Sequence, residues 1–110
     1  PHALLPLPDP LILDHLKPIV DFAAKNQLPS MSGRSTFADA GGLLSYAPDY
    51  DAMYRRAAAY VDKILKGASP NSLPVQQATR TEIVVNQKTA RALGLVIPPL
   101  FLARVDEVIE

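Results

Sequence analysis

Apolar residues recur at helical intervals in a stretch near the start of the chain. Residues 10–26 carry apolar side chains three or four positions apart, which predicts a helix with one apolar face. Asp9 and Pro10 are typical of a helix start, because Asp caps the first turn and proline is tolerated there. Pro18 predicts a kink or a restart, because proline removes one backbone hydrogen bond and clashes with the preceding turn. The apolar positions are Leu16, Ile19, Val20 and Ala23.

A second stretch with helical spacing, residues 50–66, is the clearest helix in the sequence. Asp49 can cap its first turn, and Gly67 suits the left-handed position that follows a helix end. Its charged residues fall mainly off the apolar face, which is typical of a helix that buries one side. That face contains Met53, Ala57, Tyr60, Val61, Ile64 and Leu65.

Short apolar runs outside these stretches predict strands. Residues 82–86 (EIVVN) are the strongest candidate, because β-branched residues stand in a row there. Residues 43–46 (LLSY), 28–33 and 3–5 are weaker candidates. Pro6 places the last of these at a sheet edge or a strand end.

The remaining segments predict short helices and one connector. Residues 34–42 are expected to form a short helix that ends at its pair of glycines. Residues 87–94 predict another, and the polar, proline-containing residues 68–81 predict a connector. A last helix is predicted from about residue 98 onwards. Its apolar positions are Leu102, Val105 and Ile109.

Strands that alternate with helices in this order predict an α/β fold. The rule that crossovers are right-handed makes the sheet mostly parallel, with helices on both faces. A length of 110 residues favours a single domain.

The composition excludes several classes of function. Lys plus Arg and Asp plus Glu number 11 each, and this balance argues against nucleic acid and against a basic membrane-binding patch. Cysteine is absent, which excludes disulfides and thiolate chemistry. No apolar run reaches the roughly 20 residues of a membrane span, and no signal peptide is recognisable in this chain. Because the chain begins with Pro1 rather than Met, we expect a fragment of a longer protein.

Candidate ligand-binding residues lie in three loops that follow predicted strands. Ligands of open α/β sheets bind at the carboxyl ends of the strands, so we expect the loops to lie side by side. Carboxylates bind an ammonium group, a guanidinium binds a carboxylate and an aromatic ring stacks, which together suit a small polar or zwitterionic ligand. Each residue also has a structural interpretation, as a helix cap, turn residue, solvated cation or core aromatic. The candidates are Asp9, Pro10, Ser32, Arg34, Ser45, Tyr46 and Asp49.

Catalytic, metal and cofactor sites are not indicated. The two histidines, His2 and His15, have no positioned nucleophile, and Asp14 does not share a helix face with its neighbour His15. No set of residues has the spacing of a metal site, and the glycine motifs of nucleotide-binding loops are absent. The sequence therefore predicts a protein that is not an enzyme and that needs neither cofactor nor metal.

Three motifs resemble ABC-transporter substrate-binding proteins, in the branch associated with uptake of aromatic amino acids and related small molecules. They are GGLLSY, AxxVDKILKGxxPxxLPV and VNxKTAxALGL, and the resemblance covers nearly the whole chain. It implies the type I periplasmic-binding-protein fold, in which two α/β lobes close over a ligand. The resemblance also implies that residues 1–110 are a carboxy-terminal lobe fragment, with possible interlobe crossovers at residues 45–49 and 77–82.

The resemblance further implies the solute-binding component of an ABC importer, which captures a small molecule such as an amino acid or a related carboxylate. Its partners would be that ligand and a membrane permease, and its location periplasmic, or exported and lipid-anchored. Asp9 matches an acidic position that faces the cleft, and Ser45, Tyr46 and Asp49 match the segment where the chain leaves the lobe. Without the other lobe, the fragment could pair as a homodimer. Two alternatives stay open: a ligand-sensing domain of a transcriptional regulator or receptor with the same fold, and a small α/β enzyme.

Overall fold

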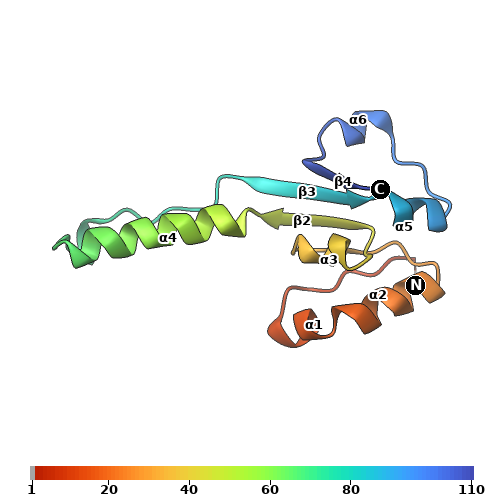
Figure 1. Cartoon of the computed structure of the whole chain (residues 1–110), viewed down its shortest axis with the longest axis horizontal. Helices are drawn as coiled ribbons and strands as arrows, with labels where there is room; N and C mark the ends of the chain where they lie inside the picture. The colour runs from red at the N-terminus through yellow and green to blue at the C-terminus, as the bar shows by residue number, and fades with distance from the viewer. Residues whose placement is uncertain (1) are drawn as a thin grey trace. The chain divides into compact units, whose positions relative to one another are not determined.

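The computed structural model describes residues 2–110, which form two compact units (Figure 1). Unit 1 contains the chain up to Ala47 together with Glu82–Glu110, and unit 2 is Pro48–Thr81. No helix among residues 2–110 has the length and apolar character needed to cross a membrane.

Unit 1 is built on a four-stranded sheet in the order β1-β2-β3-β4. β1 (Met31–Ser32) pairs with β2 (Leu44–Pro48) in parallel, and β3 (Thr81–Asn86) pairs with β4 (Glu107–Ile109) in parallel. β2 and β3 run in opposite directions, and Asn86 N donates to Leu43 O at 2.9 Å beside the start of β2 (Figure 1). The predicted α/β fold with a mostly parallel sheet is therefore confirmed.

The first predicted strand is reduced to a single bridge. Leu4 pairs with Ser30 in parallel, and Leu4 N donates to Pro29 O at 2.9 Å. Pro6 follows at once and has no N–H to extend a ladder, as expected for a strand end.

The predicted helix at residues 10–26 is two helices, α1 (Pro10–Asp14) and α2 (Leu16–Lys25). The interruption lies at His15 rather than at Pro18 itself. Pro18 has no N–H for the carbonyl of Asp14, and its ring clashes with that carbonyl, so the break lies one turn before the proline. α2 still buries Val20 and Ala23, which lie on the predicted apolar face.

The short helix α3 (Thr36–Asp39) carries the largest fully buried side chain of unit 1. Phe37 is 0% exposed, and a Cβ added to Gly42 would lie 2.2 Å from its ring. Gly41 adopts φ 110°, a left-handed conformation that ends the helix as the pair of glycines predicted.

The prediction of a long last helix from about residue 98 onwards is wrong. α5 (Gln87–Ala92) forms as expected, but the segment after it contains only the four-residue helix α6 (Pro99–Leu102) and then β4. Glu107–Ile109 forms a strand because β3 offers an open edge. Just before it, Asp106 N donates to Ile83 O at 2.9 Å, and Asp106 Oδ2 accepts from Ile83 N at 2.8 Å. Tertiary pairing therefore overrides the helical spacing of the apolar residues.

Unit 2 consists of α4 (Tyr50–Leu65), a 3₁₀ turn η1 (Pro70–Ser72) and an extended connector. The connector returns along the helix, where Tyr60 Oη donates to Pro74 O at 2.5 Å and Arg56 Nη1 donates to Gln77 O at 3.2 Å. No residue of α4 is buried. The apolar face predicted from the sequence is thus present but uncovered in this chain.

The contact between Phe37 and Gly42 predicts a large effect of Gly42→Ala. The added methyl group would overlap the Phe37 ring, and the overpacking should lower the free energy of unfolding by roughly 3 kcal/mol. Gly94→Ala is the control: Gly94 has φ 71° and nothing within 4 Å of an added Cβ, so only the left-handed backbone cost of about 1 kcal/mol applies. Chemical denaturation of both variants measures the difference, and an equal or smaller loss for Gly42→Ala would contradict the steric explanation.

Candidate functional site

Two of the three predicted loops, residues 7–10 and 32–34, meet the end of β2, residues 45–47, at one edge of unit 1. We call these three segments the rim. β1 and β2 are parallel, so both end at this edge. A Cβ on Gly33 would lie 3.3 Å from Pro8 Cγ and 4.0 Å from Tyr46 O, which shows how closely the three segments approach. A Cβ at position 33 would require Pro8 to shift by a few tenths of an ångström.

Asp9 and Pro10 lie exposed on the rim at the start of α1. Asp9 Oδ1 accepts a hydrogen bond from Leu11 N at 2.9 Å, so the carboxylate caps the helix as its position predicted. A capping carboxylate keeps a second oxygen and its charge. Capping therefore leaves Asp9 able to bind a cation at the rim.

Ser32 and Ser45 are cross-strand partners, and both are enclosed in unit 1. Ser32 Oγ donates to Pro6 O at 3.0 Å. Ser45 is 0% exposed. Its Oγ is buried and has no hydrogen-bond partner within residues 2–110. As folded, neither hydroxyl reaches the surface of the rim.

Tyr46 and Arg34 are more accessible. The alternation of β2 turns Ser45 and Ala47 inward and Tyr46 outward, where its side chain is 51% exposed. Arg34 is half-buried just beyond β1. The rim therefore offers an aromatic ring, a carboxylate and a guanidinium.

Asp49 belongs to unit 2, so it is described apart from the rim. Its Oδ1 accepts from Ala52 N at 2.8 Å and caps α4, and its Oδ2 lies 3.9 Å from Arg80 Nε. Asp49 N also donates to Arg80 O at 3.1 Å. These contacts explain its structural role in unit 2.

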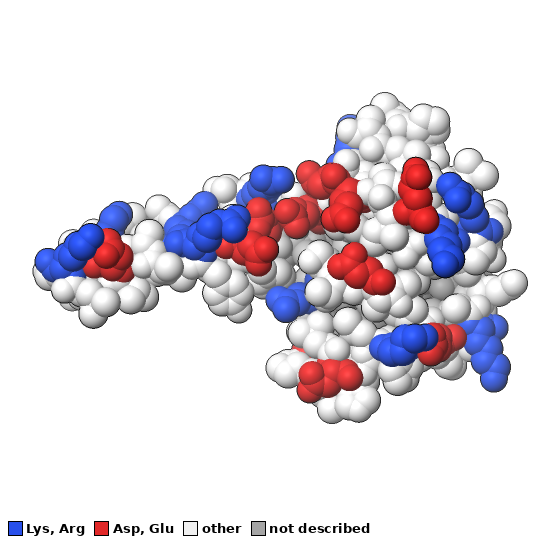
Figure 2. All heavy atoms as spheres, in the orientation of Figure 1, with Lys and Arg blue, Asp and Glu red and all other residues white. Residues whose placement is uncertain are grey.

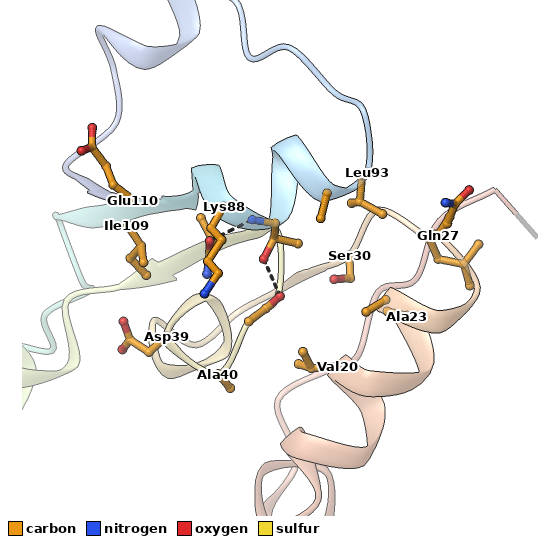
Figure 3. A pocket seen from close by; sticks show the side chains of 16 residues that line it. Val20, Ala23, Gln27, Ser30, Asp39, Ala40, Lys88, Leu93, Ile109 and Glu110 are labelled. Atoms are coloured by element: carbon orange, nitrogen blue, oxygen red, sulfur yellow. Dashed lines mark hydrogen bonds between the residues drawn. The ribbon is translucent and has the colours of Figure 1, made fainter.

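The opposite edge of unit 1 holds a cavity of about 540 Å³ that the sequence did not indicate (Figure 3). β1 and β2 begin at this cavity and end at the rim, whereas β3 and β4 end at the cavity. Its wall combines residues from α2, from the turn after α3 and from α5. Asn86, Lys88, Thr89 and Leu93 lie in the motif VNxKTAxALGL, but only the tertiary arrangement brings them together with the segments that are distant in the sequence.

The charged groups of the described residues do not form a metal site. Among residues 2–110, no group of three or more His, Asp or Glu side chains is close enough to hold an ion. Figure 2 shows both basic and acidic side chains on the face that it draws.

A family model described as "ABC transporter substrate binding protein" matches residues 2–109. The chain therefore belongs to the ABC transporter substrate-binding protein family, which is a family of binding proteins rather than enzymes.

Individual relatives agree with this assignment. The "Tyrosine-binding protein" of Clostridioides difficile (strain R20291) is 26% identical over 87 residues, which are 79% of this chain and 25% of that protein. A solved ABC domain in complex with L-Trp from Streptococcus pneumoniae is 26% identical, with a TM-score of 0.90 over 98% of this chain and 37% of its own.

Two further solved structures share the fold. A conserved domain protein from Vibrio cholerae O1 biovar El Tor is 28% identical, with a TM-score of 0.89 over 97% of this chain and 36% of its own. A ligand-free, open substrate-binding protein with adhesive properties from Clostridium difficile is 24% identical, with a TM-score of 0.70 over 97% of this chain and 36% of its own. The chain thus spans between a quarter and two fifths of the length of the proteins that it matches.

The two cross-strand serines predict opposite effects of the same substitution. Ser32→Ala should lower the free energy of unfolding by about 1 kcal/mol, because Pro6 O loses its donor. Ser45→Ala removes a buried hydroxyl that has no partner within the described chain, so stability should stay the same or rise by up to about 1 kcal/mol. Urea unfolding of both variants provides the comparison, and a clear destabilisation by Ser45→Ala would show that its hydroxyl has a stabilising partner.

Proposed function

We propose that this chain is the carboxy-terminal portion of the solute-binding protein of an ABC importer and that the rim forms one side of its ligand-binding cleft. The ligand would be a small molecule, and an aromatic amino acid or a related carboxylate is the best candidate. The observation that carries the proposal is the exposure of Asp9 and Tyr46 at one rim of a chain from a substrate-binding family.

The chemistry of the rim supports a zwitterionic aromatic ligand. The Asp9 carboxylate would bind the ammonium group, Arg34 would supply positive charge for the carboxylate, and the Tyr46 ring would stack on the ligand's side chain. One relative is named as a tyrosine-binding protein and another was solved in complex with L-Trp, and both support the same class of molecule. Gly33 keeps the rim open, because a side chain there would meet Pro8.

Closure of two lobes over the ligand would complete the site. We propose that residues 45–49 and 77–82 carry the chain between the lobes and that unit 2 packs on the first lobe. The division of the chain after Ala47 and after Thr81 supports this proposal, as does the uncovered apolar face of α4. The loaded protein would deliver its ligand to a membrane permease from outside the cytoplasm, as a periplasmic or a lipid-anchored protein.

The role of Asp9 can be separated from its role as a helix cap. Asn caps helices about as well as Asp, so Asp9→Asn in the full-length protein should leave the unfolding free energy within about 0.5 kcal/mol of the wild type. Loss of the negative charge should raise the Kd for L-tryptophan or L-tyrosine at least about tenfold. Isothermal titration calorimetry measures the Kd.

Asp14→Asn is the matched control for that experiment, because Asp14 is an exposed carboxylate on the same helix but outside the rim. It should change neither affinity nor stability. Equal affinities of the Asp9→Asn and wild-type proteins would remove Asp9 from the site. Failure of the wild-type protein to bind either aromatic amino acid would reject the proposed ligand class.

The proposed packing of α4 on the first lobe gives a second test. Leu65 is 82% exposed in this chain, but burial by the other lobe would make Leu65→Ser lower the unfolding free energy of the full-length protein by about 2 kcal/mol. Ala59→Ser, on the polar side of α4, should change it by less than about 0.5 kcal/mol. Thermal or urea unfolding gives both values.

The isolated 110-residue chain offers a complementary measurement. Without the first lobe, we propose that a second copy covers the α4 face, so that the chain forms a homodimer and Leu65→Ser weakens it. Sedimentation velocity would detect the dimer. A monomeric wild-type chain, together with an unchanged stability of the full-length Leu65→Ser protein, would reject any burial of this face.

A further inference from the structure

The cavity at the opposite edge of unit 1 has the dimensions of a small-molecule site. Its volume of about 540 Å³ falls within the roughly 300–1,000 Å³ that is usual for ligand pockets. It lies where β1 and β2 begin, and none of the residues that line it belongs to the rim. A molecule bound here would not contact the rim residues proposed above.

The floor of the cavity is apolar. Val20 and Ala23 of α2 contribute one side, Leu93 after α5 contributes another, and Ile109 of β4 lies at its end (Figure 3). Val20 and Ala23 are 5% and 3% exposed, so this floor is continuous with the core. An apolar group that entered the cavity would lose contact with water on that side.

The mouth of the cavity carries opposite charges. Lys88, from α5, extends over the cavity towards the end of α3, where Asp39 and Ala40 lie (Figure 3). Within residues 2–110, neither Lys88 nor Asp39 takes part in an ion pair or a side-chain hydrogen bond. Glu110 lines the cavity as well, so an ammonium group and carboxylates are both available to a ligand that carries the complementary charges.

The frame of the cavity is held by hydrogen bonds between its walls. Thr89 Oγ1 donates to Gly41 O at 2.8 Å, and Asn86 Nδ2 donates to Ala38 O at 3.0 Å. The first bond ties α5 to the turn after α3, and the second ties the end of β3 to α3 itself, so the two charged side chains project from connected walls. The backbone of these walls therefore needs little ordering when a ligand binds, which favours affinity.

We propose that this cavity is a second binding site, which takes a small zwitterion with an apolar body, the chemistry of a free α-amino acid. Lys88 binds the carboxylate of the ligand, Asp39 binds its ammonium group, and the apolar side chain rests on the floor formed by Val20, Ala23 and Leu93. The site acts independently of the rim, and the proposal does not depend on the function proposed for the rim.

The test is a titration of the full-length, ¹⁵N-labelled protein with L-leucine and L-phenylalanine, followed by the amide signals of Gly41 and Thr89. Both residues line the cavity, and neither belongs to the rim. We expect saturable shifts of these signals within roughly 10 mM ligand, a range that covers weak binding sites. L-leucinamide, which lacks the carboxylate, should bind at least about tenfold more weakly.

Two variants locate the site. Lys88→Gln should weaken L-leucine at least about tenfold but leave L-leucinamide unchanged, because the amide has no carboxylate for Lys88 to bind. Ala24→Trp places a large ring at the mouth from an exposed position of α2, and it should abolish the shifts without altering the core. Lys25→Gln removes an exposed charge on the same helix outside the cavity and should have no effect.

Three results would overturn the proposal. One is the absence of saturable shifts at Gly41 and Thr89 with either amino acid. Another is binding that Lys88→Gln and Ala24→Trp both leave unchanged. The third is loss of the shifts in Tyr46→Ala, which would mean that the signals report binding at the rim.

Discussion

The Phe37 ring beneath Gly42 is the contact on which the rest of unit 1 depends. α3 has only four residues and gains little from its own hydrogen bonds, so tertiary packing must hold it. Phe37 is fully enclosed, and Gly42 leaves no room for a side chain above it. Phe37 and Gly42 lie between β1 and β2 in the sequence, so their contact determines where β2 begins. The pairing of Ser32 with Ser45 follows from that start.

The register of β2 decides which chemistry each side of the sheet presents. A shift of one residue would exchange the two faces, so that Tyr46 would enter the core and Ser45 would face outward. In the observed register the ring is available at the rim and the two serines are enclosed. The same start of β2 places Gly41 against Thr89 at the opposite edge, where the cavity lies. Both edges of unit 1 thus depend on one packing contact.

Unit 2 presents a different balance of forces. Asp49 caps α4, and the connector returns along the helix with bonds from Tyr60 and Arg56, so the helix is well defined locally. Long helices in proteins nevertheless owe most of their stability to an apolar face that is buried, and this chain buries none of it. That imbalance is the physical reason for proposing that another lobe covers α4.

Local chemistry alone determined much of this protein. Asp9 and Asp49 predicted the starts of two helices, and Gly41 predicted the end of a third. The β-branched residues 82–86 predicted the most buried strand. These predictions succeeded because helix caps, left-handed glycines and β-branched runs act over only a few residues. The three sequence motifs likewise indicated the family without any structure.

Tertiary structure decided the rest. The last segment joined β3 as β4, since an open strand edge outweighed helical spacing, and cross-strand register enclosed Ser45. The cavity with Lys88 and Asp39 exists only because α5 packs against the turn after α3, an arrangement that no local pattern encodes.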